Sequence, residues 1–184
     1  VYMSDNGGVT WKHTLYIDDN TGISDIVMDP NNSRVLFAGA WQLKLKTWIR
    51  VSGGPGSGIF KSIDGGLSWN KLKDNGLPKK DVGKIALAMT PASPDRLYAL
   101  IETGDGIPYN GKETESGELW RSEDNGKTFK LINSNRELGS RQAYYTRTAA
   151  SPDNANEVYF ISYRFFSSID GGVSLENRSQ LSSP

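Results

Sequence analysis

A short motif occurs four times in this sequence, and its repetition constrains the fold more than any other feature. The pattern is Ser-x-Asp-x-Gly-x-Ser/Thr followed by an aromatic residue, as in "SIDGGLSW". We name the four copies motif turns 1 to 4: Ser4–Trp11, Ser62–Trp69, Ser122–Phe129 and Ser168–Leu175. Their first residues are 58, 60 and 46 positions apart. Repetition at such a period is typical of proteins assembled from similar structural units.

A second pattern runs in step with the motif. It consists of an apolar strand, a turn that contains proline and another apolar strand, and it occurs at 26–39, 87–100 and 148–161. Its prolines, Pro30, Pro91 and Pro152, are 61 residues apart. The shorter last interval between the motif turns is therefore interpreted as a deletion within one repeat.

Each repeat predicts four short strands, because its segments rich in β-branched and aromatic residues are bounded by Gly, Pro, Asn and Asp. The expected strands are about 23–29, 34–40, 58–62 and 68–73, then 83–90, 95–102, 117–122 and 128–133, then 144–151, 157–162, 164–168 and a weak 173–177. Four-stranded units at a fixed long period indicate the blades of a β-propeller.

The predicted fold class is therefore all-β, a β-propeller segment of about three four-stranded antiparallel blades plus half a blade. Residues 1–16 would supply only the third and fourth strands of a blade, followed by blades at 17–76, 77–136 and 137–184, the last eroded at its end. No stretch keeps apolar residues at helical spacing for three turns, which argues against a helical fold.

The motif resembles the Asp box of sialidase-like and sortilin-like BNR-repeat propellers, which forms the hairpin between the third and fourth strands of a blade. Its acidic side chain can accept backbone N–H groups of its own turn, and its glycine permits the positive φ of a tight hairpin. Asn6 stands in place of the aspartate in motif turn 1, and Leu175 in place of the aromatic residue in motif turn 4. The residues assigned this structural role are Ser4, Asn6, Gly8, Trp11, Ser62, Asp64, Gly66, Trp69, Ser122, Asp124, Gly126, Phe129, Ser168, Asp170 and Gly172.

The resemblance extends to "IVMDPNN", "LFAGAWQ" and "GPGSGIFKSIDGG", which look like segments of large, usually exported bacterial proteins of this kind. Those proteins are sortilin-like (Vps10-like) or resemble xyloglucanase-type glycoside hydrolases. The resemblance implies a periplasmic or extracellular protein, although the chain contains no signal peptide. It also implies that the chain is an interior segment, whose partners are the remaining blades of a longer polypeptide or other subunits.

The connections that follow the second and fourth strands of a blade line the pocket face of a propeller. The connection at 41–58 carries Trp41, Trp48 and Arg50, and aromatic platforms beside polar groups suit a sugar ring or a protein partner. The alternative is that the tryptophans only anchor the loop on its blade. Three residues near the last repeat are further candidates for ligand binding: Arg141, Tyr144 and Arg147.

A cluster of carboxylates, Asp18, Asp19 and Asp25, precedes and enters the first strand of the first full repeat. The xyloglucanase-type resemblance implies that such residues could act as acid and base, if they were spaced suitably across a cleft. The alternative is a hydrogen-bonded turn. The sequence thus favours a non-catalytic binding or scaffold segment, with part of a glycoside hydrolase as the second hypothesis.

Composition excludes several classes of function. Lys and Arg together number 21, as do Asp and Glu, so no net charge attracts nucleic acid. No apolar run is long enough for membrane insertion. The absence of cysteine and the single histidine, His13, argue against thiolate or multi-histidine metal sites and against a Ser-His-Asp triad. We expect no cofactor and no metal.

Overall fold

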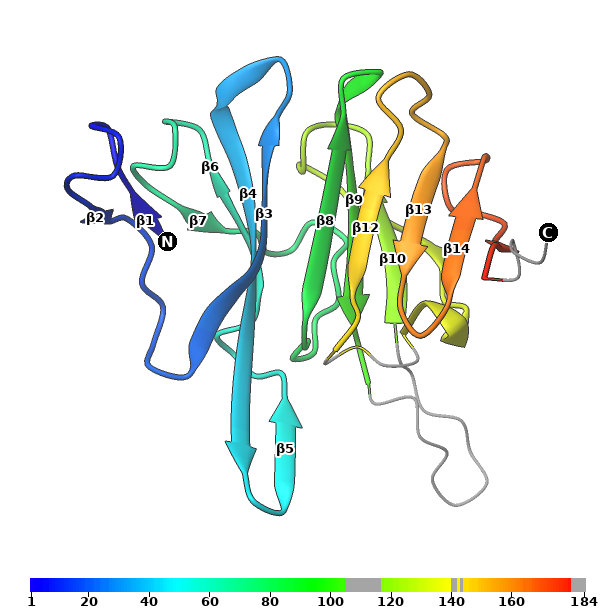
Figure 1. Cartoon of the computed structure of the whole chain (residues 1–184), viewed down its shortest axis with the longest axis horizontal. Coiled ribbons are helices and arrows are strands. Elements are labelled where there is room, and N and C mark those ends of the chain that lie inside the picture. Colours follow the sequence, from blue (N-terminus) through cyan, green and yellow to red (C-terminus); the bar gives the residue numbers. More distant parts are fainter. Residues whose placement is uncertain (105–116, 140–141, 143, 180–184) are drawn as a thin grey trace.

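The structure, a computed structural model, describes residues 1–104, 117–139, 142 and 144–179. It consists of strands arranged in a row of antiparallel sheets (Figure 1). The elements are β1 (Tyr2–Met3), β2 (Lys12–His13), β3 (Thr21–Asp29), β4 (Asn32–Lys46), β5 (Ile49–Ser52), β6 (Gly58–Ser62), β7 (Asn70–Lys71), β8 (Ile85–Thr90), β9 (Ser93–Glu102), β10 (Gly117–Ser122), β11 (Lys130–Asn133), the 3-10 turn η1 (Arg136–Gly139), β12 (Arg147–Ala150), β13 (Val158–Ile161), β14 (Phe165–Ser168) and β15 (Glu176–Asn177). No helix in the described part of the chain is long or apolar enough to span a membrane.

The strands form one two-stranded hairpin and three larger sheets, which we call blades I to IV. Blade I is β1–β2, blade II has the order β3-β4-β6-β7, blade III has β8-β9-β10-β11, and blade IV has β12-β13-β14-β15. Consecutive strands pair with antiparallel register throughout. The predicted all-β fold of four-stranded antiparallel sheets is confirmed.

One connection differs from the sequence-based expectation. The second strand of blade II was expected to end near residue 40, but β4 continues to Lys46 and pairs with the additional strand β5. Residues 41–46, "WQLKLK", alternate apolar and polar side chains, which is itself a strand signal. A two-stranded ribbon therefore replaces most of the expected loop and extends from the lower end of blade II in Figure 1.

The core of the protein lies between the blades. Strands β3, β8 and β12 lie side by side (Figure 1), so that β8 is covered on both of its faces. Ile85 and Leu87 pack into the cluster between blades II and III, whereas Ala86 and Ala88 face the cluster between blades III and IV. Because both faces are covered, β8 is a continuous apolar run and does not alternate with polar residues.

Hydrogen bonds join the inner strands of neighbouring blades. The hydroxyl of Ser24 donates to the carbonyl oxygen of Ile85 at 2.7 Å, and the N–H of Leu87 donates to the carboxylate of Asp25 at 3.0 Å. The hydroxyl of Thr90 donates to the carbonyl oxygen of Ser151 at 2.5 Å on the other side of blade III. Polar groups of the inner strands thus hold each blade against the next.

Each motif turn is closed by the same internal hydrogen bonds. In motif turn 2 the N–H of Gly66 donates to Ser62 Oγ at 2.8 Å, and Ser62 Oγ donates to Asp64 Oδ1 at 2.8 Å. The N–H and the hydroxyl of Ser68 donate to the two oxygens of Asp64 at 2.9 and 2.5 Å. Motif turns 3 and 4 repeat this arrangement. In motif turn 1 the side chain of Asn6 accepts and donates in the same positions.

The residue at the last motif position determines which group donates a hydrogen bond to the carbonyl oxygen of the glycine at the fifth position. In motif turns 1 and 2 the indole N–H of the turn's own tryptophan donates to that carbonyl, at 3.0 Å in both. Phe129 and Leu175 have no donor, and here an asparagine of the preceding blade donates instead. Asn75 Nδ2 lies 3.3 Å from the oxygen of Gly126, and Asn133 Nδ2 lies 2.9 Å from the oxygen of Gly172. Motif turns 3 and 4 are therefore joined to the neighbouring blade.

The aspartates of the motif predict a loss of stability in acid. A hydroxyl at the seventh motif position lowers the pKa of Asp64 and of Asp170 from 3.8 to about 2. Burial raises the pKa of Asp124, but the corresponding hydrogen bonds outweigh it and bring the pKa to about 2. Because the folded-state values are depressed, this stabilisation is present above pH ~4 and is lost as the pH falls towards 2.

We expect replacement of all three aspartates by asparagine to flatten the decline of stability between pH 4 and 2, because asparagine closes motif turn 1 without a titrating group. The measurement is the midpoint of urea unfolding at pH 2, 3, 4 and 7 for the parent and the triple variant. Equal slopes for the two proteins would show that other carboxylates govern acid unfolding.

Candidate functional site

The ribbon formed by β4 and β5 separates the two tryptophans that the sequence placed in one loop. Trp41 is half-buried at the base of the ribbon, where its indole N–H donates to Ser52 Oγ at 2.9 Å. Trp48 lies at the tip with 82% of its surface exposed. Arg50 is also exposed and lies opposite Leu45 in the register of the ribbon. Trp41 thus has an anchoring position, whereas Trp48 and Arg50 are available for contact.

A buried carboxylate holds the base of the ribbon against blade III. Glu102, at the end of β9, is only 4% exposed. Its Oε2 accepts hydrogen bonds from the hydroxyl of Ser52 at 2.7 Å and from the N–H of Lys84 at 2.8 Å. The ammonium group of Lys84 lies 5.4 Å from the centre of the Trp41 ring, and burial lowers the pKa of Lys84. Sequence reasoning missed this network, because nothing local marks Glu102 as buried.

The glycine-rich segment after β5 is folded onto the start of the ribbon. The backbone N–H of Gln42 donates to Ser57 Oγ at 2.8 Å, and its side-chain oxygen accepts the N–H of Gly56 at 2.9 Å. Gly54 forms an isolated bridge with Val82 of the connection to blade III. The ribbon therefore extends from a base that is fixed on both blades.

The three aspartates of the predicted acid–base cluster have different surroundings. Asp18 Oδ1 accepts the N–H of Asn20 at 2.8 Å, and both of its oxygens lie 2.9 Å from the hydroxyl of Thr21. Asp19 accepts the phenol of Tyr16 at 2.5 Å, and this hydrogen bond raises the pKa of Tyr16. These contacts are those of a hydrogen-bonded turn.

Asp25 instead lies within β3 at the seam with blade III. Its oxygens accept the N–H of Ile26 and the N–H of Leu87, each at 3.0 Å. Arg147, exposed at the start of β12, places one guanidinium nitrogen 3.8 Å from Asp25 Oδ1. The structure thus brings Asp25 together with Arg147 across blade III. A catalytic role for the aspartates stays a prediction.

Of the other candidates near the last repeat, Tyr144 lies shortly before the start of β12. Tyr144 is 74% exposed and its ring centre lies 6.3 Å from that of Tyr145. Arg141 lies outside the described residues. No group of three or more His, Cys, Asp or Glu side chains in the described part of the chain is arranged to hold a metal ion.

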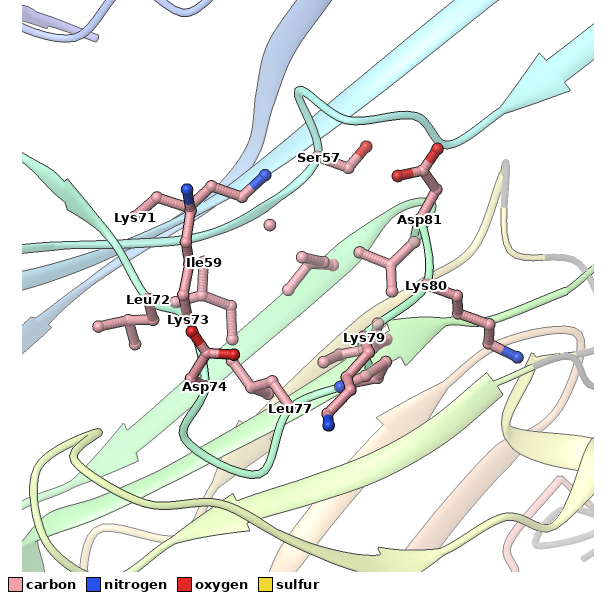
Figure 2. A pocket seen from close by; sticks show the side chains of 15 residues that line it. Ser57, Ile59, Lys71, Leu72, Lys73, Asp74, Leu77, Lys79, Lys80 and Asp81 are labelled. Atoms are coloured by element: carbon pink, nitrogen blue, oxygen red, sulfur yellow. The ribbon is translucent and has the colours of Figure 1, made fainter.

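A pocket of about 360 Å³ lies between blades II and III, beneath the connection from β7 to β8. Its apolar lining residues include Ile59, Leu77, Val82, Ile85 and Ile101. Its charged lining residues are Lys71, Lys73, Asp74, Lys79, Lys80 and Asp81. Figure 2 shows these charged side chains around the apolar residues.

A second, smaller pocket of about 310 Å³ adjoins the first at Asp81. It is lined by β5, through Arg50 to Ser52, and by the end of β9 at Glu102. The two pockets and the ribbon therefore form one continuous surface. The pockets could not be predicted from the sequence, because the residues that line them come from strands and connections of two blades.

The family model described as "Sortilin, neurotensin receptor 3" (Sortilin-Vps10) matches residues 1–165. The chain belongs to the Sortilin-Vps10 family. Among curated proteins, none matches the sequence significantly.

Solved structures show the fold of this Sortilin-Vps10 family member to be that of a propeller segment. The GH74 xyloglucanase from Xanthomonas campestris has a TM-score of 0.64 at 17% identity, over 94% of this chain and 24% of the enzyme. An ancestral GH74 enzyme has a TM-score of 0.61 at 20% identity, over 95% of this chain and 20% of the enzyme. YCF48 bound to D1 peptide has a TM-score of 0.54 at 13% identity, over 86% of this chain and 40% of YCF48. The chain thus spans less than half of each of these proteins.

Proposed function

We propose that this chain is a non-catalytic binding segment of a larger propeller protein, and that it takes its ligand on the face formed by the β4–β5 ribbon and the connection from β7 to β8. The observation that carries this proposal is the ribbon itself. Its base is fixed by Trp41, Ser52 and Glu102, while its tip exposes Trp48 and Leu45, 82% and 66% exposed. Exposed aromatic and aliphatic side chains on a rigid support are typical of interfaces. That YCF48 is described with a bound peptide agrees with a binding role.

We further propose that the partners include the remaining blades of a longer chain or other subunits. Support comes from apolar side chains that are exposed on blades II and IV. Ile26 and Met28 of β3 are 45% and 51% exposed on the side towards blade I, which here has only two strands. Ile161 and Phe165, which pair across β13 and β14, are 48% and 38% exposed. An additional sheet on each side would bury these side chains.

Two finer assignments belong with this proposal. The hydrogen bonds of the motif turns support their identification as Asp boxes of the BNR type, because serine, aspartate and glycine close each turn in the manner described above. Export to the periplasm or the extracellular space is proposed from the resemblance to exported propeller proteins.

Part of a glycoside hydrolase is the second candidate, favoured by the similarity of the fold to GH74 enzymes. A retaining or inverting hydrolase needs two carboxyl groups on opposite sides of a bound sugar. Asp18 and Asp25 are each engaged by backbone N–H groups, which reduces their freedom to transfer a proton. The ribbon offers exposed side chains for contact, whereas these aspartates are held in hydrogen bonds. We therefore favour binding over hydrolysis.

The proposal is tested by shortening the ribbon. Leu43 and Ser52 lie directly opposite each other, so residues 44–51 can be replaced by Asn-Gly, which suits a two-residue hairpin turn. We expect the variant to keep the parent's melting temperature within a few degrees and to lose binding to arrays of immobilised peptides and glycans. The same proteins are assayed for hydrolysis of xyloglucan.

Each outcome decides between the two candidates. Binding by the parent without hydrolysis, lost in the shortened variant, supports a binding segment. Hydrolysis that persists in the shortened variant and disappears in Asp25→Asn would support the glycoside hydrolase. Failure of the parent to bind any array member would contradict the proposal.

A further inference from the structure

Positive charge is concentrated on the surface formed by the ribbon and the two pockets. The whole chain is neutral, with 21 basic and 21 acidic residues. Residues 41–52 nevertheless contain Lys44, Lys46 and Arg50 and no acidic residue, and residues 71–82 contain four lysines against two aspartates. A local excess of one sign attracts segments of the opposite sign even on a neutral protein.

The ribbon combines these charges with aliphatic side chains. Lys44 pairs with Val51 across the two strands, and Lys46 pairs with Ile49. Directly opposed residues of an antiparallel pair lie on the same face. That face therefore presents the two lysines next to Val51 and Ile49, whose side chains are 45% and 49% exposed. It suits a partner that carries both carboxylates and apolar groups.

The larger pocket also combines lysines with aliphatic side chains, here in a concave surface. Its volume of about 360 Å³ is close to the lower end of the range for ligand sites, roughly 300–1,000 Å³, and suits one or two side chains. Its apolar lining includes Ile59, Ile85 and Val82. An apolar side chain of leucine or phenylalanine size would find a hydrophobic environment there.

Two lysines at this pocket are available to a ligand. Lys71 is already engaged, because its ammonium group donates to the carbonyl oxygen of Pro55 at 2.6 Å. Lys73 and Lys79 are exposed and have no hydrogen bond or ion pair with any described residue. Figure 2 places Lys73 and Lys79 on different sides of Leu77. Carboxylates that flank an apolar anchor can therefore reach a lysine on either side.

We propose that the pocket between blades II and III anchors an acidic, extended segment of a partner protein. One leucine- or phenylalanine-sized side chain enters the pocket, and the carboxylates on either side of it pair with Lys73 and Lys79. The rest of the segment continues past the second pocket towards Arg50 of the ribbon. This inference rests on the proposed binding function and names the chemistry of its partner. An uncharged sugar would leave the lysines without a role.

The test uses the whole chain and a fluorescein-labelled peptide, Gly-Ser-Glu-Glu-Leu-Glu-Glu-Ser-Gly, in a fluorescence anisotropy titration. We expect saturable binding that weakens as NaCl rises from 50 to 500 mM, because salt screens exposed charges. The double variant Lys73→Gln/Lys79→Gln should raise the dissociation constant about threefold to tenfold. Peptides in which Leu is replaced by Ser, or every Glu by Gln, should bind at least about tenfold more weakly.

Matched variants separate this site from general electrostatic attraction. Lys73→Arg/Lys79→Arg keeps both charges and should bind the peptide as the parent does. Lys130→Gln removes an exposed lysine of β11 outside the pocket lining and should also leave binding unchanged. If Lys130→Gln weakened peptide binding as much as Lys73→Gln/Lys79→Gln does, the proposal would be overturned, because binding would then depend only on the overall charge.

The inference and the proposed function can fail separately. Binding of glycans or uncharged peptides by the parent, without binding of the acidic peptide, would overturn the inference and leave the binding function intact. Equal binding of decanoate and the peptide would overturn the assignment to a protein segment. If the parent binds no peptide and no glycan, both are wrong.

Discussion

Gly126→Ala is expected to destabilise the protein by about 2–5 kcal/mol, because two costs add at this position. The residue has a φ of +78°, in the left-handed region where a side chain costs about 1–2 kcal/mol. A Cβ atom would also lie 2.6 Å from Cε1 of Phe37, whose ring is fully buried between blades II and III. Such an overlap in a packed core costs about 1–3 kcal/mol more.

Gly66→Ala supplies the matched control for this prediction. Gly66 occupies the same position in motif turn 2 and has a φ of +89°, but its nearest contact for an added Cβ is Trp69 at 3.6 Å. This variant should therefore lose only about 1–2 kcal/mol. Chemical denaturation of both variants and the parent measures the difference. Equal losses would show that the packing of motif turn 3 on blade II adds nothing to stability.

The contrast between these glycines follows from how the motif turns are attached. Motif turns 1 and 2 end in tryptophan, which caps its own turn through the indole N–H. Motif turns 3 and 4 end in Phe129 and Leu175 and depend on the preceding blade for the same hydrogen bond. The same short sequence thus closes a hairpin in every blade, while its last residue determines whether the glycine carbonyl accepts a hydrogen bond from its own turn or from an asparagine outside it.

Repetition made most of the fold predictable from the sequence. The third strand of blades II and III was predicted with the bounds that the structure shows, Gly58–Ser62 and Gly117–Ser122. Each of these strands begins at a glycine and ends at the serine of the motif, and these boundary residues recur in both copies. Local signals that agree between copies are more reliable than one signal taken alone.

The candidate site was much less predictable. The ribbon was expected to be a loop because the second strand was predicted to end near residue 40, although "WQLKLK" carries a strand pattern. The pocket depends on Ile59 from blade II and Ile101 from blade III, which only the packing of the blades brings together. Lys73 and Lys79 stood out in no motif, since isolated lysines are ordinary surface residues.

Replacement of Glu102, which holds the base of the ribbon, is expected to cause the second large loss of stability. Glu102→Ala removes an acceptor that is 4% exposed and leaves the hydroxyl of Ser52 and the N–H of Lys84 without their partner. Hydrogen bonds to charged groups contribute about 1.5–3 kcal/mol each, but removing the buried carboxylate also removes the cost of its own desolvation, which offsets part of the loss. We expect the protein to lose about 2–4 kcal/mol and the ribbon to become more mobile at its base.

Hydrogen–deuterium exchange locates this effect within the chain. In Glu102→Ala the amides of residues 43–52 should exchange faster, whereas those of motif turn 2 should keep the parent's rates, because no contact links Glu102 to that turn among the hydrogen bonds described above. Glu102→Gln keeps the size of the side chain and one acceptor oxygen, so its losses should be smaller. If exchange in the ribbon is unchanged in Glu102→Ala, the ribbon is held by Trp41 and the glycine-rich segment alone. A rigid ribbon that survives this change would then owe its position to blade II and to the Gly54–Val82 bridge, and not to Glu102.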